Sequence, residues 1–319
     1  MKQLSHLFVP LLLSAITVSL PACKKDKTTH SNNTSTGSNL PIYPAREELN
    51  VAYGDHPLQK MDVYFPDNYN EQTPVVIMIH GGGFVAGVKE DFTTQAKLFR
   101  NEGFVAVNIS HRLVDTTGLL QTPPVRMNSA IKVSDELNDV HASLAKYKGM
   151  AAQWHSGTGK IYMAGHSAGA ILSMLYTYGE KNINVRACAN WAGITDLSIP
   201  HDSVLTMQDP RYLELLHRAS GAEPKTANNL AYMAISPYWV ANRNGGKPTI
   251  SIFPANNVVL NTPGEVEYNL HNTRNLHTLL KNKGIKEKLS IYANNDHGFS
   301  QPGSWEKLIK ETAAFFKEQ

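Results

Sequence analysis

The sequence predicts an α/β protein built on a mostly parallel, doubly wound sheet. Short, nearly continuous apolar runs alternate along the chain with longer stretches of helical periodicity. Unbroken apolarity is typical of strands that are covered on both faces, because neither face meets water. Regular alternation of strand and helix indicates βαβ units around a parallel sheet. With 319 residues, 42% of them hydrophobic, the chain can bury a core of this size.

The apolar runs predict the strands of this sheet in chain order. They are Pro74–His80, Phe104–Ser110, Lys160–Gly165, Val185–Trp191, Pro248–Phe253 and Lys288–Ala293. Upstream, "NVAYG" and "QKMDVYFP" predict two antiparallel strands at the edge of the sheet. The helices are predicted at Asp91–Asn101, Asn128–Lys148, Ala168–Tyr178, Glu265–Lys283 and Ser304–Lys317. The last of these carries one apolar stripe, which is the spacing of a helix that packs on a sheet.

One connection is much longer than the others. About fifty residues, 197–246, separate two predicted strands, whereas most connections in compact domains are a few residues long. We therefore expect a helical insertion that forms a lid. It would cover the carboxyl ends of the strands, where open α/β sheets bind ligands.

The first residues predict export from the cytoplasm. An apolar stretch from Leu7 to Leu20 follows a basic start and precedes Ala22 and Cys23, which is the layout of a secretory signal at 1–22. The stretch is too short to span a membrane as a helix. "LPAC" resembles a bacterial lipobox, which implies lipidation of Cys23, a flexible tether at 23–41 and a lipid anchor in the outer membrane after transport across the inner one. The folded domain is expected at 42–319.

The composition excludes several classes of function. Thirty basic against 27 acidic residues give a net charge of +3, and no basic stripe is present that could neutralise phosphates, so no nucleic-acid partner is expected. Cys188 would be the one thiol of the folded domain, which excludes an internal disulfide framework. No Cys and His residues show the spacing of metal ligands, and the sequence predicts no metal and no other cofactor.

A serine between glycines is the first chemical signal. "GHSAG", residues 165–169, follows a predicted strand and begins the helix "AGAIL". This is the context of a nucleophile elbow, in which small residues let strand and helix approach while the serine projects its hydroxyl from a strained turn. Ser167 is therefore the predicted nucleophile.

A glycine cluster at the end of another strand is the second signal. "HGGGF", residues 80–84, directly follows the strand "PVVIMI". Attack of a serine on an ester builds negative charge on the carbonyl oxygen, and unhindered backbone N–H groups can bind that charge. Gly82 and Gly83 are the predicted donors of this oxyanion hole, together with the N–H of Ala168.

The base is expected after the serine and the acid in chain order. His297 lies in "NNDHGF", between the last strand and the last helix, and is the predicted base. The other histidines after Ser167 lie in the insertion or on a polar helix, where solvent exposure accounts for them. They are His201, His217, His271 and His277.

Taken in order, "HGGGF", "GHSAG", "GITDL" and "DHGF" resemble the α/β-hydrolase superfamily. The resemblance is to HGGG-type carboxylesterases near the hormone-sensitive-lipase and feruloyl-esterase-like branch, and it runs from about Leu49 to the C-terminus. It implies the α/β-hydrolase fold and a serine carboxylic-ester hydrolase that forms an acyl-enzyme on short-chain or polysaccharide-linked acetyl or feruloyl esters. The alternatives are a kynurenine-formamidase-like amidohydrolase and a binding module without catalysis.

The acid of the triad departs from the family's pattern. The family usually carries Asp soon after the strand that is "PTISIF" here, but this chain continues "PANNVVLNTPGEVEY". Counting forward from the strand gives Asn257, and counting back from the next helix gives Glu265. A carboxylate can compensate the charge of an imidazolium, which Asn cannot, so Glu265 is favoured. Asn257, Glu267 and Asp196 remain possible in its place.

Overall fold

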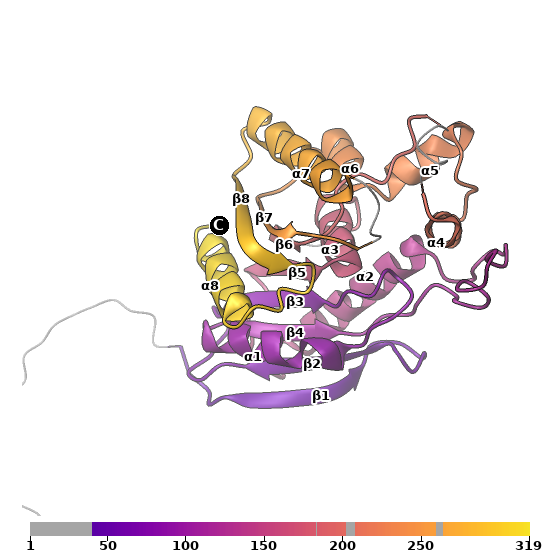
Figure 1. Ribbon diagram of the computed structural model, residues 1–319. Coiled ribbons are helices and arrows are strands. Elements are labelled where there is room, and N and C mark those ends of the chain that lie inside the picture. Colours follow the sequence, from indigo (N-terminus) through magenta and orange to yellow (C-terminus); the bar gives the residue numbers. More distant parts are fainter. Residues whose placement is uncertain (1–39, 183, 202–207, 260–263) are drawn as a thin grey trace, which may run out of the picture. The chain divides into compact units, whose positions relative to one another are not determined.

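An eight-stranded, mostly parallel sheet forms the centre of the fold (Figure 1). The computed structural model describes residues 40–182, 184–201, 208–259 and 264–319, and Leu40–Gln319 is one unit. The predicted signal at 1–22, Cys23 and the tether up to residue 39 lie outside the described residues. Within these described ranges, no helix is both long enough and apolar enough to cross a bilayer.

The strands follow the predicted order along the chain. They are β1 (Arg46–Ala52), β2 (Lys60–Phe65), β3 (Val75–Ile79), β4 (Val105–Ile109), β5 (Ile161–His166), β6 (Val185–Trp191), β7 (Thr249–Asn256) and β8 (Glu287–Asp296). Their order across the sheet is β1-β2-β4-β3-β5-β6-β7-β8. Strand β2 pairs antiparallel with β1 and β4, and all pairs from β4 to β8 are parallel. The predicted doubly wound sheet, with its antiparallel edge, is confirmed.

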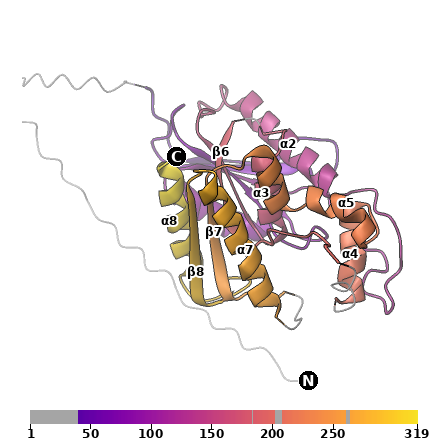
Figure 2. The same cartoon turned by 90° about the horizontal axis from the view of Figure 1, so that it is seen from above.

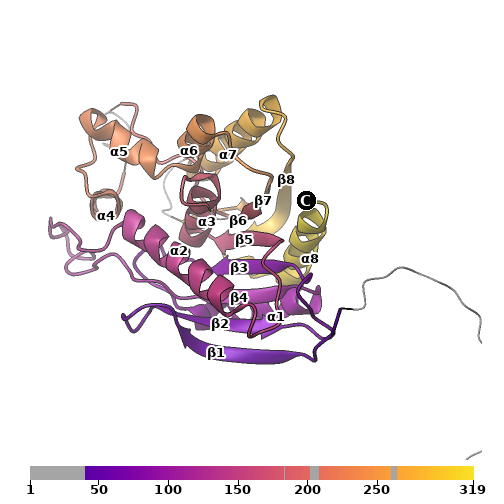
Figure 3. The same ribbon diagram turned by 180° about the vertical axis from the view of Figure 1, so that it is seen from behind.

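The helices cover both faces of the sheet. They are η1 (Lys89–Phe92), α1 (Thr93–Asn101), α2 (Val133–Met150), α3 (Ala168–Tyr178), α4 (Pro210–Ser220), η3 (Thr226–Asn228), α5 (Asn229–Ala234), α6 (Pro237–Asn244), α7 (Glu265–Asn282) and α8 (Ser304–Lys317). Helices α1 and α8 pack together on one face, whereas α2, α3, α6 and α7 form a continuous layer on the other. Figure 2 shows α8 and α2 on opposite sides of the strands, and Figure 3 shows α2 and α3 from behind.

The central strands contribute to two cores at once. In β3, Val75, Ile77 and Ile79 belong to the buried cluster under α2 and α3, while Val76 and Met78 belong to the cluster under α1 and α8. Successive side chains of a strand point to opposite faces, so a strand between two helical layers must be apolar at every position. This explains the unbroken apolar runs in the sequence.

The long insertion is helical in its described part, which carries α4, η3, α5 and α6; residues 202–207 lie outside that part. Helix α4 is bonded to the segment that precedes α2. The buried guanidinium of Arg218 donates to Glu214 Oε1 at 2.8 Å and to the carbonyl oxygens of Asp115 at 2.9 Å and Val125 at 2.6 Å. Glu214 Oε1 also accepts the N–H of Met127 at 3.0 Å. These hydrogen bonds hold α4 against that segment.

Replacement of Arg218 tests this attachment. Arg218→Met removes the guanidinium from the buried carboxylate of Glu214, which keeps the contacts with His217 Nδ1 at 3.3 Å and the Met127 N–H at 3.0 Å. We expect the free energy of unfolding to fall by about 3 to 5 kcal/mol in urea titrations. The matched control is Arg211→Met on the same helix, because Arg211 is 51% exposed and pairs with Asp209 at the surface, whereas Arg218 is 0% exposed. That control should leave the unfolding midpoint nearly unchanged. Equal losses in the two variants would contradict the attachment.

Candidate active site

Ser167 stands at a strained turn between β5 and α3. Its backbone has φ of 54° and ψ of −121°, a region that costs energy for any residue with a side chain. The turn packs backbone against backbone: a Cβ on Gly169 would lie 2.2 Å from the carbonyl oxygen of Ile79, and one on Gly165 would lie 2.2 Å from that of Gly169. Only glycine fits at these two positions. The close packing places Ser167, a partly exposed residue, at the carboxyl end of β5.

The Ser167 hydroxyl contacts the ring of His297, and that ring in turn contacts the side chain of Asn257. His297 Nε2 lies 2.9 Å from Ser167 Oγ, and His297 Nδ1 lies 2.6 Å from Asn257 Oδ1. Sheet register explains the meeting, because Asn256 pairs with Asp296 at the ends of β7 and β8. The residues that follow these two therefore leave the sheet side by side. An amide oxygen only accepts, so Nδ1 carries the hydrogen and Nε2 is free to accept the hydroxyl proton.

The sequence favours Glu265 as the partner of His297, whereas the structure places Asn257 there. Strand β7 continues past Phe253 to Asn256, so counting forward from the strand gives the residue at Nδ1. Glu265 lies in the first turn of α7, and its Oε1 accepts the N–H of Val259 at 2.9 Å. Its carboxylate thus holds the segment that follows Asn257.

Asp196 and Glu267 do not hold the His297 ring either. Asp196 Oδ1 accepts the N–H of Ser198 at 2.9 Å within its own turn. Glu267 is exposed on the surface of α7. Counting forward from the strand had already given Asn257, and Glu265 was favoured because only a carboxylate can offset the charge of an imidazolium. The pairing of β7 with β8, which sets Asn257 beside His297, was the information that the sequence lacked.

The glycine loop, residues 80–84, lies against the turn at Ser167. A Cβ on Gly81 would lie 3.3 Å from Ser167 Cβ and 2.9 Å from His166 Nδ1. Gly82 and Gly83 have φ of 118° and 62°, and a Cβ on Gly82 would lie 2.0 Å from the carbonyl oxygen of Ala86. Glycine is therefore required both for the backbone conformation and for the close approach.

Hydrogen bonds to the carbonyl groups of Gly81 and Gly82 fix the directions of the N–H groups that follow them. His80 Nδ1–H donates to the Gly81 carbonyl at 2.7 Å, and the Gly82 carbonyl accepts the N–H groups of Val85 and Ala86 at 3.1 and 3.0 Å. In a trans peptide the C=O and N–H point in opposite directions. The N–H of Gly82 therefore points away from His80, and the N–H of Gly83 points away from the turn that follows it.

The N-terminus of α3 supplies a further amide beside Ser167. Ala168 is the first residue of α3, and the first N–H groups of a helix have no intrahelical acceptor. They also lie at the positive end of the helix dipole, which favours an anion. Helix α4 borders the glycine loop, since a Cβ on Gly83 would lie 3.9 Å from Leu215 Cδ2. The predicted donors Gly82, Gly83 and Ala168 thus come from two segments that flank Ser167.

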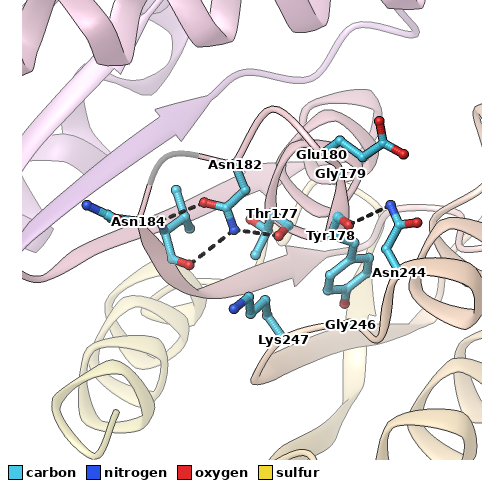
Figure 4. Close-up of a pocket in the computed structure, with 10 residues that line it drawn as sticks. Thr177, Tyr178, Gly179, Glu180, Asn182, Asn184, Asn244, Gly246 and Lys247 are labelled. Carbon is cyan, nitrogen blue, oxygen red and sulfur yellow. Dashed lines mark hydrogen bonds between the residues drawn. The ribbon is translucent and has the colours of Figure 1, made fainter.

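A hollow of about 510 Å³ lies elsewhere, at the C-terminal end of α3 and the starts of β6 and β7 (Figure 4). Asn182 Nδ2 donates there to the Thr177 carbonyl at 2.7 Å, and Asn244 Nδ2 donates to the Tyr178 carbonyl at 3.1 Å. These amides satisfy the last carbonyls of the helix. The hollow is at the amino ends of the strands, opposite the edge that carries Ser167.

The profile of one family matches this chain over residues 61–253, which is more than half of its length. The chain belongs to the BD-FAE family. The BD-FAE match includes the glycine loop and Ser167 and stops before Asn257 and His297, so the position of these two beside Ser167 comes from the structure.

Curated relatives of this BD-FAE protein match over parts of their length. A kynurenine formamidase of Salmo salar is 29% identical over 131 residues, which are 41% of this chain and 38% of the fish protein. A kynurenine formamidase of Danio rerio is 26% identical over 47% of this chain and 46% of its own. The non-reducing polyketide synthase nvfA of Aspergillus novofumigatus is 28% identical over 40% of this chain and 6% of its own. The chain thus spans less than half of each.

Solved structures share the fold at low sequence identity. A truncated carbohydrate esterase from gut microbiota has a TM-score of 0.64 and 18% identity, over 86% of this chain and 95% of its own. Esterase B of Lactobacillus rhamnosis has a TM-score of 0.63 and 17% identity, over 88% and 90% of the two chains. Est2 of Thermogutta terrifontis has a TM-score of 0.61 and 21% identity, over 86% and 94%. The BD-FAE chain therefore has the predicted α/β-hydrolase fold.

Burial keeps the histidines of the site neutral. Desolvation lowers the pKa of His297, and the nearby charge of Asp296 acts in the opposite direction without cancelling this effect. Burial also lowers the pKa of His80, and it lowers the pKa of His111, whose ring stacks on His80 at 4.5 Å, to about 3. An imidazole with a lowered pKa remains unprotonated, and so able to accept a proton, at a more acidic pH than an ordinary histidine.

The substitution Asn257→Asp tests whether Asn257 is the side chain that accepts the Nδ1–H of His297. A negative charge at Nδ1 favours the imidazolium, so the pKa of His297 should rise and the acidic limb of the kcat/KM profile should move to higher pH. Above that limb we expect kcat to rise roughly five- to tenfold, because a hydrogen bond between charged groups is about 1 kcal/mol stronger than a neutral one.

The matched control is Asn256→Asp, which adds the same charge at an exposed neighbouring residue. It should move the limb and kcat much less than Asn257→Asp does, because the added carboxylate is exposed to solvent and does not accept the Nδ1–H of His297. A profile of Asn257→Asp that coincides with that of the unchanged protein would contradict the assignment of Asn257 to His297.

Proposed function

We propose that this chain is a serine ester hydrolase that works through an acyl-enzyme. The observation that carries the proposal is the contact chain from Asn257 through His297 to Ser167, which ends at a strained strand-to-helix turn. A hydroxyl in hydrogen-bond reach of an oriented, neutral imidazole is the arrangement of an activated nucleophile. The unhindered amides of the glycine loop beside it give the developing negative charge a place to bind.

The chemistry uses only side chains and amides of this chain. His297 Nε2 takes the hydroxyl proton as Ser167 Oγ bonds to the ester carbonyl carbon, and the carbonyl oxygen becomes an oxyanion. The N–H groups of Gly82, Gly83 and Ala168 bind that oxyanion. When the C–O bond to the alcohol breaks, His297 returns the proton to the leaving oxygen. A water molecule then gives a proton to His297 Nε2 as its oxygen bonds to the acyl carbon. When the bond from that carbon to Oγ breaks, His297 returns the proton to Oγ, and the carboxylic acid leaves.

Asn257 has a limited part in this cycle. Its Oδ1 holds Nδ1–H and so fixes the tautomer in which Nε2 can accept a proton. It adds no negative charge to offset the imidazolium that forms with the oxyanion. The amides of the oxyanion site therefore provide a larger share of the transition-state stabilisation than they would beside an Asp.

The proposed substrates are short-chain carboxylic esters or acetyl and feruloyl esters linked to polysaccharide. Membership of the BD-FAE family and the α/β-hydrolase fold support this class, as do the solved relatives described as carbohydrate esterase and esterase. We further propose that Cys23 is lipidated and anchors the enzyme at the bacterial outer membrane. An enzyme at that surface would meet polymeric esters outside the cell.

A second candidate is an amidohydrolase of the kynurenine-formamidase type. The observation in its favour is the 29% identity with the Salmo salar kynurenine formamidase over 131 residues. The same serine and histidine would serve, with an amine as the leaving group. Ester hydrolysis and amide hydrolysis would both use the glycine loop and the turn at Ser167.

Labelling and substrate comparison test the proposal. A fluorophosphonate probe should label the protein and should fail to label Ser167→Ala, because the probe bonds to an activated serine. The matched control is Ser173→Ala, which removes a buried hydroxyl from α3, the helix that follows Ser167, and should label normally.

The same proteins are then assayed with 4-nitrophenyl acetate, methyl ferulate and N-formylkynurenine. Higher kcat/KM on the two esters supports the esterase, and higher kcat/KM on N-formylkynurenine favours the amidohydrolase. If the unchanged protein is neither labelled nor active on any of the three, the enzyme proposal fails and a binding module without catalysis takes its place.

A further inference from the structure

His166, the residue between Gly165 and Ser167, is bonded to the segment that carries the base. Its Nε2 lies 2.7 Å from the backbone carbonyl oxygen of His297, 131 positions further along the chain. A carbonyl oxygen only accepts, so Nε2 carries the hydrogen and donates it. The turn that projects the nucleophile thus also holds the main chain of its partner.

The His166 ring is fixed in place by aromatic neighbours. Its centroid lies 4.8 Å from that of the His297 ring, 5.9 Å from that of Trp305, and 6.1 and 6.2 Å from those of Phe299 and Phe92. Burial lowers the pKa of His166 to about 4, so the ring is neutral near pH 7. A ring packed on several sides has few other rotamers open to it, and its N–H direction is correspondingly well defined.

The loop after β8 is closed on itself by its own bonds. The Asp296 carboxylate accepts the N–H of Ser300 at 2.9 Å and its hydroxyl at 2.6 Å, and the Asp296 carbonyl accepts the N–H of Phe299 at 3.0 Å. Trp305 Nε1 donates to the Gly298 carbonyl at 3.2 Å. These bonds give the loop its shape, but they do not tie it to the turn of Ser167. Two contacts tie the loop to that turn: the side-chain contact of His297 Nε2 with Ser167 Oγ, and the bond from His166 to the main chain of His297.

The bond from His166 is important because Asn257, the partner of His297 Nδ1, is a neutral amide. The neutral amide of Asn257 attracts Nδ1–H less strongly than a carboxylate would. The direction and position of the imidazole therefore depend more on where its backbone is held. Proton transfer requires Nε2 within hydrogen-bond reach of Oγ, and a displacement of about 1 Å in such a site can lower the rate about a hundredfold.

We propose that His166 is a positioning residue of the hydrolase: its Nε2–H bond to the His297 carbonyl sets the distance between the base and Ser167. This inference rests on the proposed function. Because donor and nucleophile are consecutive residues, any movement of the turn carries the base with it.

Two side chains of matched length test the donor. Gln and Met place an N–H donor and a methyl group, respectively, the same number of bonds from Cβ as Nε2 of His. For His166→Met we expect kcat on 4-nitrophenyl acetate to fall roughly ten- to a hundredfold with KM changed less than about threefold, because the chemical step and not binding is impaired. His166→Gln should recover kcat to within a few-fold of the unchanged protein.

A double-mutant comparison separates positioning from folding. In a His297→Ala background the base is gone, so His166→Met should change the small residual activity less than about threefold, while it lowers the thermal midpoint as much as in the unchanged background. Rates are expressed per folded protein, measured from the amplitude of the unfolding transition. If His166→Met does not fold, His166→Asn replaces it, because the Asn amide stops one bond short of the carbonyl.

The outcomes are distinct. Equal kcat in His166→Met and His166→Gln, or an equal fold-loss with and without His297, would overturn the positioning role. In both cases an active unchanged protein leaves the esterase proposal intact. An unchanged protein without activity and without fluorophosphonate labelling would remove the proposed function itself, and the positioning role with it.

Discussion

The contact between the Ser167 turn and the end of β3 is the constraint on which the site depends. At Gly169 the helix backbone approaches the carbonyl oxygens of Ile79 and His80 so closely that no Cβ could stand between them. This contact brings the glycine loop that follows β3 to the hydroxyl of Ser167. Looser packing would separate the Ser167 hydroxyl from the amides of the glycine loop, which are the proposed oxyanion donors, even with every side chain of the site present.

Hydrogen bonds within the glycine loop fix the directions of its backbone amides. The Gly81 and Gly82 carbonyls are held by His80, Val85 and Ala86, which leaves the neighbouring N–H groups directed elsewhere. Groups fixed before a substrate arrives need no reorganisation when charge develops, and they act most strongly where water is excluded. In the proposed mechanism, a neutral third member such as Asn257 fits this site, because the amides would stabilise the oxyanion independently of the charge on the imidazole.

The similarity to known proteins establishes the family and the fold, whereas the geometry of the site supports the proposed reaction. The BD-FAE match and the solved structures establish family and fold. Because one fold hosts many reactions, the esterase proposal depends on the geometry at Ser167 and not on the fold. The same geometry also serves amide hydrolysis, so the leaving group must be identified by comparing substrates.

The sequence by itself determined the order of strands and helices, the turn at Ser167 and the glycine loop. These are local features: apolar runs reflect burial on both faces, and small residues mark places where backbones touch. It also predicted His297 as the base from its position between the last strand and the last helix, and the structure places its Nε2 2.9 Å from Ser167 Oγ. Its role as the base stays a proposal.

Only the tertiary structure decided between Asn257 and Glu265. The answer depended on where β7 ends and on its register with β8, which pairs Asn256 with Asp296 and so sets Asn257 beside His297. Register is a relation between segments that are distant in sequence, and no local pattern encodes it. The bond from His166 to the His297 carbonyl is hidden for the same reason, since its two ends are 131 residues apart and meet only at the edge of the folded sheet.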